Sequence, residues 1–377
     1  MPLSDPASGF SVARNANIGS KFQAVHKKIG VVFTLCFWYN KADLQKQRMV
    51  RCMTMKKKTI LSLCLFFLLF GGLLLTATFT DLQVSQLLTR HALPAGQYYA
   101  DDFFGVLFEC VGTAPELLLG AVCAAMIAVW AMRILKHGAV RTLLILAGGA
   151  GTVGMYVWAF YDLFHYICRH IPIGQSVPAF LWGISAFLAL FCAALTLFAV
   201  NCFSDDTLRK LPRFACVTMG SILFALALVN ILKNPIGRMR FRAMNVIGDF
   251  SGYTPWYVVN GQPDKAWMRE TFGTADAFKS FPSGHTRAAA ATFYLVSLAD
   301  VIELKSKRSR TLLWCFALLF TGCVAVSRIM VGAHFFSDVL VGGTIGFAVC
   351  MVTREFFLVD RKHLRALKKA GDEHTER

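Results

Sequence analysis

The sequence predicts an all-α membrane protein, a polytopic bundle of about eight helices that each cross a lipid bilayer. Hydrophobic residues make up 56 % of the 377 residues and charged residues only 16 %. A soluble domain carries about 25 % charged residues, so much of this surface faces something other than water. Several apolar runs of roughly 20 residues, long enough to span a hydrocarbon core as a helix, are the second indication. Short basic clusters between the runs, which are typical of cytoplasmic loops, are the third.

The apolar runs divide the chain into three parts. We expect a polar N-terminal tail over residues 1–58, a transmembrane domain over 59–358 and a basic cytoplasmic tail over 359–377. Met53 or Met55 would start the chain directly before a basic flank and the first span, so the N-terminal tail is either a cytoplasmic segment or an extension before the true start. The expected spans are 59–80, 106–135, 141–164, 177–202, 213–233, 285–304, 311–331 and 334–358.

The positions of lysine and arginine predict the orientation of the spans. If eight spans alternate, the basic clusters that precede the first span, follow the last and separate the others all fall on one side, so both termini are expected in the cytoplasm. The formal net charge of +17 is spread over these loops and does not indicate nucleic-acid binding. Segment 233–284 is basic although it is expected on the outer face, and an anionic substrate would explain this exception.

Three segments around this outer region carry residues suited to chemistry on a phosphate. Lys233 and Arg240 lie at the outer end of the fifth span. The run Pro282–His285 opens the sixth span, and the last segment joins the seventh span to the eighth with Ser327, Arg328, His334 and Asp338. The predicted topology places all three at one membrane face, where they would form a single site.

During phosphoryl transfer, negative charge spreads over the non-bridging oxygens of the phosphoryl group. Cationic side chains and free backbone N–H groups stabilise this charge. Lys233, Arg240 and Arg328 would supply the cations, and the guanidinium groups can bind phosphate through two nitrogens. Ser283 and Gly284 stand where a helix begins, so their N–H groups are expected to point at the anion. All five are therefore predicted phosphate ligands.

Two imidazoles complete the predicted site. His334 and Asp338 are four residues apart at the start of a helix and share one face. Asp338 is expected to accept the Nδ1–H of His334, which leaves the Nε2 lone pair to attack phosphorus. His285 would protonate the leaving oxygen and then activate water. We expect no metal and no other cofactor, because the cationic side chains do the neutralising.

These segments resemble those of the type 2 phosphatidic acid phosphatase superfamily, whose pattern is K-x6-R-P, P-S-G-H and S-R-x5-H-x3-D. The resemblance implies the same roles for the residues above and a core of six spans, so the third and fourth spans look like an insertion. It covers about 213–358 and says little about 1–212. Phe241 departs from the pattern, because the family has proline there.

The resemblance implies a lipid-borne substrate such as phosphatidic acid, phosphatidylglycerol phosphate or a polyprenyl pyrophosphate, including undecaprenyl pyrophosphate, and favours a bacterial plasma membrane. A phosphotransferase that moves phosphate between lipids would use the same residues. A transporter or scaffold that keeps the motifs only as a lipid-binding cleft is a hypothesis of another class. Phosphate release from a panel of lipid phosphates separates these hypotheses.

Other polar and small residues receive simpler interpretations. Arg238 and Arg242 are outside the pattern and are expected to face solvent or lipid headgroups. His170 is expected to be a loop or interfacial residue. Gly342 and Gly346 have the spacing that lets helices pack closely in a membrane.

Overall fold

A computed structural model describes residues 57–170 and 177–358 of the chain, and all of the regular structure in these ranges is helical. The predicted tails, up to residue 56 and from residue 359, lie outside the described residues. The helices are α3 (Lys57–Thr89), α4 (Phe103–Val111), α5 (Ala114–Ile134), α6 (Ala139–His170), α7 (Ala179–Asn201), α8 (Asp205–Leu208), α9 (Leu211–Ile236), α10 (Phe241–Ile247), α11 (Lys265–Phe272), α12 (Gly284–Ala289), η1 (Ala290–Phe293), α13 (Tyr294–Val301), α14 (Lys307–Met330), α15 (Phe336–Thr353) and η2 (Arg354–Leu358).

The predicted class of a multi-pass helical membrane protein is confirmed. Among the described residues, seven helices are long and apolar enough to cross a membrane. The sixth expected span, 285–304, is instead built of three short pieces, α12, η1 and α13. At this break the hydroxyl of Thr292 donates a hydrogen bond of 2.7 Å to the carbonyl of Ala289. Such a bond competes with the regular helical ladder and is a physical reason for the interruption.

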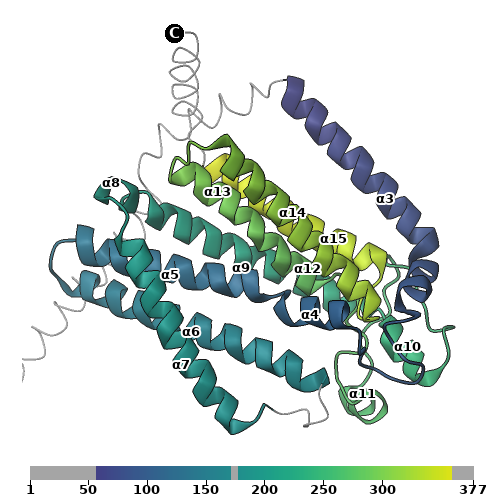
Figure 1. The fold of residues 1–377 in the computed structure, drawn as a ribbon. Helices are drawn as coiled ribbons and strands as arrows, with labels where there is room; N and C mark the ends of the chain where they lie inside the picture. Colours follow the sequence, from purple (N-terminus) through teal and green to yellow (C-terminus); the bar gives the residue numbers. More distant parts are fainter. Residues whose placement is uncertain (1–56, 171–176, 359–377) are drawn as a thin grey trace, which may run out of the picture. The chain divides into compact units, whose positions relative to one another are not determined.

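The chain separates into two units, Met1–Phe67 and Leu68–Arg377. The described part of the first unit is one helical stretch, 57–67. In the second unit, α5, α6 and α7 pack against one another, and α5 also packs against α9 (Figure 1). The helices α12, α14 and α15 pack together beside α9. Every residue discussed below belongs to the second unit.

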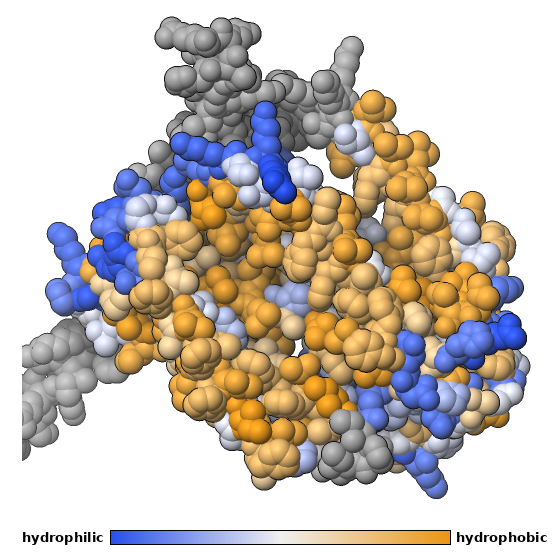
Figure 2. Space-filling model, in the orientation of Figure 1, coloured by the Kyte–Doolittle hydropathy of each residue, from blue (hydrophilic) through white to orange (hydrophobic). Residues whose placement is uncertain are grey.

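The surface of the second unit fits a lipid environment. Hydrophilic side chains gather near α8 and near α10 and α11, and apolar side chains cover the surface between these ends (Figure 2). Large hydrophobic side chains on α7 and α14, including Phe187 and Leu319, are more than half exposed. Exposed apolar area of this kind is favourable in a bilayer and costly in water.

Close packing between α15 and the start of α12 depends on two glycines. A Cβ on Gly342 would collide with the carbonyl oxygen of Ser283, and one on Gly346 would lie 2.6 Å from the carbonyl oxygen of Arg287 and 2.8 Å from Cβ of Ala290. The expectation that this pair allows close helix packing is therefore confirmed.

Gly342→Ala is expected to lower the melting temperature and the activity together, because the added methyl group pushes the Ser283 segment away from α15. Overpacking of this kind costs about 1–3 kcal/mol. Gly322→Ala in α14 is the matched control, since a Cβ there meets nothing within 4 Å. Thermal unfolding in detergent is the measurement, and equal melting temperatures for the two variants would contradict the packing argument.

Candidate active site

The three motif segments meet at one end of the second unit, where α9 ends and where α12 and α15 begin (Figure 1). Backbone contacts hold them together. The N–H of Ser283 donates to the carbonyl of Asp338 at 2.9 Å. A guanidinium nitrogen of Arg240 donates to the carbonyl of Ala333 at 3.1 Å. Residues that are 55 and 93 positions apart in the chain therefore share one small region.

His334 lies in the turn between α14 and α15 and is 1 % exposed. Its Nδ1 is 2.5 Å from the carbonyl oxygen of Ser280. A carbonyl only accepts, so Nδ1 carries the proton and the lone pair is on Nε2. The tautomer is the expected one, but the predicted acceptor is not: the Oδ2 atom of Asp338 is 3.8 Å from Nδ1, too far for a hydrogen bond.

Asp338 is fully buried and is paired with Arg238 instead. Nη1 of Arg238 donates to Oδ1 of Asp338 at 2.7 Å, and Nη2 donates to Oδ2 of Asp81, in α3, at 3.0 Å. The other oxygen of Asp338 accepts from the Ser280 hydroxyl at 2.5 Å and from the Phe335 N–H at 2.8 Å. The prediction that Arg238 faces solvent or headgroups is wrong, because its side chain is 0 % exposed between two carboxylates.

The three predicted cations lie around His334 at different depths. Arg240 is 7 % exposed, and its Nε donates to the carbonyl of Asp276 at 2.8 Å. Arg328 is 1 % exposed at the end of α14. Lys233 is half-buried, and its Nζ lies 3.8 Å from the point where a Cβ on Gly284 would project. The region is therefore deepest at Arg328 and reaches the surface near Lys233 and Gly284.

His285 stands in the first turn of α12 and is partly exposed. Its Nε2 atom is buried and has no hydrogen-bond partner among the side chains and backbone of residues 57–170 and 177–358. The ring makes an edge-to-face contact with Tyr166 of α6, with centroids 5.2 Å apart. A buried nitrogen without a hydrogen-bond partner destabilises the fold. Such a nitrogen is typical of a group that acts on a bound ligand.

Ser283 does not have the free donors that were predicted for it. Its N–H donates to Asp338, and its hydroxyl accepts from the N–H of Thr286 at 3.3 Å as the N-cap of α12. Ser283 therefore holds the start of α12 against α15. Gly284, at the first helical position, keeps an N–H that has no intrahelical acceptor.

A second buried cluster surrounds Glu109 of α4, which is 1 % exposed. Its carboxylate lies 2.9 Å from Nη1 of Arg328 and 3.5 Å from Nη1 of Arg242. Nε2 of His170 is 3.3 Å away, and the His170 side chain is only 7 % exposed. Arg242 also stacks on the ring of Tyr98, at 4.4 Å from its centroid. The predictions of a solvent or headgroup role for Arg242 and of a loop or interfacial role for His170 are wrong.

A carboxylate balances part of the positive charge in the outer segment. Burial by itself would raise the pKa of Asp276, but the positive charges of Arg240 and Lys279 outweigh it and hold this pKa below the usual value. Lys279 contacts the Asp276 carboxylate at 2.7 Å. Asp276 is therefore an anion at neutral pH and stands beside the cation of Arg240.

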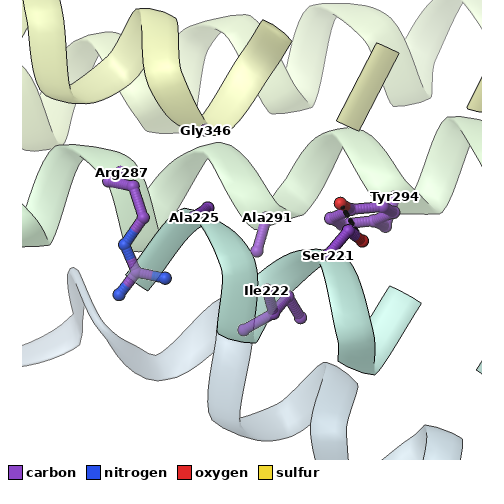
Figure 3. Close-up of a pocket in the computed structure, with 7 residues that line it drawn as sticks. All are labelled: Ser221, Ile222, Ala225, Arg287, Ala291, Tyr294 and Gly346. Carbon is purple, nitrogen blue, oxygen red and sulfur yellow. Dashed lines mark hydrogen bonds between the residues drawn. The ribbon is translucent and has the colours of Figure 1, made fainter. Parts of the chain in front are cut away.

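The pocket in Figure 3 is separate from this region. It lies between α9 and the pieces of the broken sixth span, near the hydrogen bond of 2.5 Å from the Tyr294 hydroxyl to Ser221. It contains none of the predicted site residues. Its lining consists of Ser221, Ile222, Ala225, Arg287, Ala291, Tyr294 and Gly346. Within the described ranges, no group of three or more His, Cys, Asp or Glu side chains is placed to hold a metal ion.

The fold and these side chains define a multi-pass helical membrane protein with buried cations and two imidazoles gathered at one end of its helices. Residues 214–361 match the family model of the PAP2 superfamily, which spans every residue of the three motifs. The similarity of the chain to this superfamily lies in that segment.

Curated relatives point the same way. Over 129 residues the chain is 31 % identical to a lipid A 1-phosphatase of Rhizobium etli, an alignment that covers 33 % of this chain and 43 % of the relative. Over 209 residues it is 26 % identical to a probable diacylglycerol pyrophosphate phosphatase 1 of Schizosaccharomyces pombe, covering 51 % and 69 %. The chain thus spans less than half the length of the rhizobial relatives, of which a second comes from Rhizobium johnstonii. No solved structure matches the chain significantly.

Proposed function

We propose that this protein is a membrane phosphatase that hydrolyses the phosphate of a lipid phosphate or lipid pyrophosphate. The observation that carries the proposal is the meeting of His334, His285 and three cationic side chains in one region that is buried at Arg328 and half-buried at Lys233. The names of the relatives support a lipid-borne substrate, lipid A or diacylglycerol pyrophosphate in their case. A polyprenyl pyrophosphate offers the same chemistry.

In the first step, the Nε2 lone pair of His334 attacks phosphorus. The new P–N bond forms as the P–O bond to the leaving group breaks, and His285 gives its proton to the departing oxygen. The Nδ1–H of His334 donates to Ser280, so the positive charge that develops on the imidazole faces a carbonyl dipole. Lys233, Arg240 and Arg328 neutralise the phosphoryl oxygens, which is the main catalytic task in phosphoryl transfer.

In the second step, the neutral His285 takes a proton from water as that water attacks the phosphohistidine. The P–N bond breaks, inorganic phosphate leaves, and both imidazoles return to their first state. His285 thus serves as acid and then as base.

The positions of the lysines and arginines support an outward-facing site, since the basic loops cluster at the opposite ends of the spans. The substrate head would then enter at the extracytoplasmic face while its tail stays in lipid. The apolar surface beside this end of the helices is the surface such a tail would contact (Figure 2).

The test is release of inorganic phosphate by purified protein in detergent, with phosphatidic acid, diacylglycerol pyrophosphate, lipid A and a polyprenyl pyrophosphate as substrates. We expect release from at least one of them and competitive inhibition by orthovanadate, which resembles phosphorus in transfer. Folded protein that releases no phosphate from any of the four and binds no vanadate would overturn the proposal.

Removal of divalent metal ions is expected to leave the rate unchanged, because three protein cations neutralise the phosphate. The measurement is phosphate release before and after dialysis against EDTA, with a Mg²⁺-dependent phosphatase treated in parallel as the control. A loss of activity that added Mg²⁺ restores would contradict the metal-independent mechanism.

A further inference from the structure

Arg328 has a buried partner from a part of the chain that precedes the superfamily segment. Glu109 lies in α4, whereas that segment begins at residue 214. The carboxylate is within 2.9 Å of one guanidinium nitrogen of Arg328, and both side chains are 1 % exposed. Removing one partner of an ion pair with this burial leaves the other charge buried and unpaired, so the Glu109 carboxylate favours a guanidinium that stays close to it.

Glu109 is itself held from three directions. Oε1 contacts Arg328 from α14 and Arg242 from α10, and Oε2 contacts Nε2 of His170 from α6. His170 is anchored in turn, because its Nδ1 is 2.8 Å from the carbonyl of Ala100. The carboxylate therefore has little freedom to move away from Arg328.

One edge of Arg328 is left without a protein partner. Its Nε is buried and makes no hydrogen bond to the part of the chain that the structure describes, and the buried Nη1 lies 2.9 Å from the Glu109 carboxylate as an ion pair without hydrogen-bond geometry. One nitrogen of this arginine lies against a carboxylate, and a second buried N–H has no acceptor. The guanidinium can therefore bind a second anion. A phosphoryl group can accept from such a planar donor edge.

We propose that Glu109 is a positioning residue that holds Arg328 in the orientation in which its free edge binds the phosphoryl group of the substrate. This inference rests on the proposed phosphatase function, and it assigns part of the phosphate-binding machinery to α4, outside the superfamily segment. Glu109 acts through Arg328 and has no part in the bond-breaking steps. Glu109 could also have the opposite effect and compete with phosphate for Arg328. The experiment below would detect this competition as tighter vanadate binding by the Glu109 variant.

The test compares Glu109→Gln with Glu116→Gln. Glu116 is a matched control, because it is a largely buried carboxylate on the neighbouring helix α5 that pairs through both oxygens with a buried arginine, Arg287. Both substitutions leave an arginine without its anion, so both are expected to lower the melting temperature. Only Glu109→Gln is expected to weaken vanadate binding and raise KM, by about tenfold or more, the scale of effect seen when outer partners of a ligand-binding group are removed.

A double-mutant cycle with Arg328→Ala separates positioning from general destabilisation. If Glu109 acts through Arg328, Glu109→Gln adds no further loss of vanadate affinity in the Arg328→Ala background. Losses that add, equal vanadate affinity in Glu109→Gln and Glu116→Gln, or tighter vanadate binding by Glu109→Gln would each overturn the inference. Each of these outcomes would be seen in the variants while the wild-type protein still releases phosphate. Failure of the proposed function would instead be seen as an absence of phosphate release by the wild-type protein.

Discussion

Replacing His334 with alanine is expected to reduce phosphate release by roughly a thousandfold or more, since His334 is the nucleophile of the proposed mechanism. The structure gives the reason in its contacts. Nδ1 of His334 is tied to Ser280, so the ring is fixed with Nε2 free, and the cations Arg240 and Arg328 lie in the same buried region. Steady-state phosphate release measures the loss.

The intermediate itself can be trapped in the companion variant His285→Ala. With a radiolabelled lipid pyrophosphate, the leaving phosphate needs little protonation, so the first step survives better than the hydrolysis that needs His285 as base. We expect turnover to fall by about 10²- to 10⁴-fold and acid-labile label to accumulate on the protein. His91→Ala is the control, because His91 is exposed and outside the motifs.

The double variant His285→Ala with His334→Ala should carry no label. Label on protein that lacks His334 would assign the nucleophile to another residue. An absence of label in His285→Ala, together with normal release of phosphate, would show that His285 is not the base for the second step.

Arg238→Met is expected to produce the largest loss of stability among single substitutions in this region. It leaves Asp81 and Asp338 buried at 0 % exposure without their shared cation. Breaking a buried ion pair by removing one partner costs about 3–5 kcal/mol. Thermal unfolding in detergent should show a large decrease in melting temperature, whereas the exposed control Arg269→Met should change little.

A second substitution can test the cause of that loss. Asp81→Asn removes one of the two unpaired carboxylates, so the pair Arg238→Met with Asp81→Asn should melt higher than Arg238→Met alone. If the single Arg238 variant unfolds at the wild-type temperature, the buried triad does not stabilise the fold as the contacts indicate.

Much of the arrangement could be predicted from the sequence, because it follows from local patterns. Apolar runs of membrane length predict the spans, and their alternation places Lys233, His285 and His334 at one face. The broken sixth span could not be predicted in the same way. The bond from Thr292 that accompanies the break is a matter of side-chain conformation.

The partners of the buried arginines were missed because they are distant in the chain. Asp81 lies 157 positions before Arg238, and Glu109 lies 133 positions before Arg242. Spacing rules for helices connect residues three or four apart and cannot find such pairs. One signal was available: Glu109 is an ionisable residue inside a predicted span, which is a reason to expect a functional partner.

Ser280 shows a different limit. Its carbonyl accepts the Nδ1–H of His334, and its hydroxyl donates to Asp338. A backbone carbonyl is present at every residue, so no residue type marks this acceptor in a sequence. The spacing of four positions from His334 to Asp338 predicts their proximity, but the hydrogen bond of His334 depends on the path of the loop before Pro282.

The contacts of Asp81 and Glu109 have a consequence for chimeras and truncations. A fragment that begins near residue 214 would keep every motif side chain. It would nevertheless leave Arg238 with one carboxylate instead of two, and Arg328 with none from Glu109. A catalytic segment transplanted between relatives should therefore carry its own α3 and α4, because those helices supply the counter-ions on which the donor arginines depend.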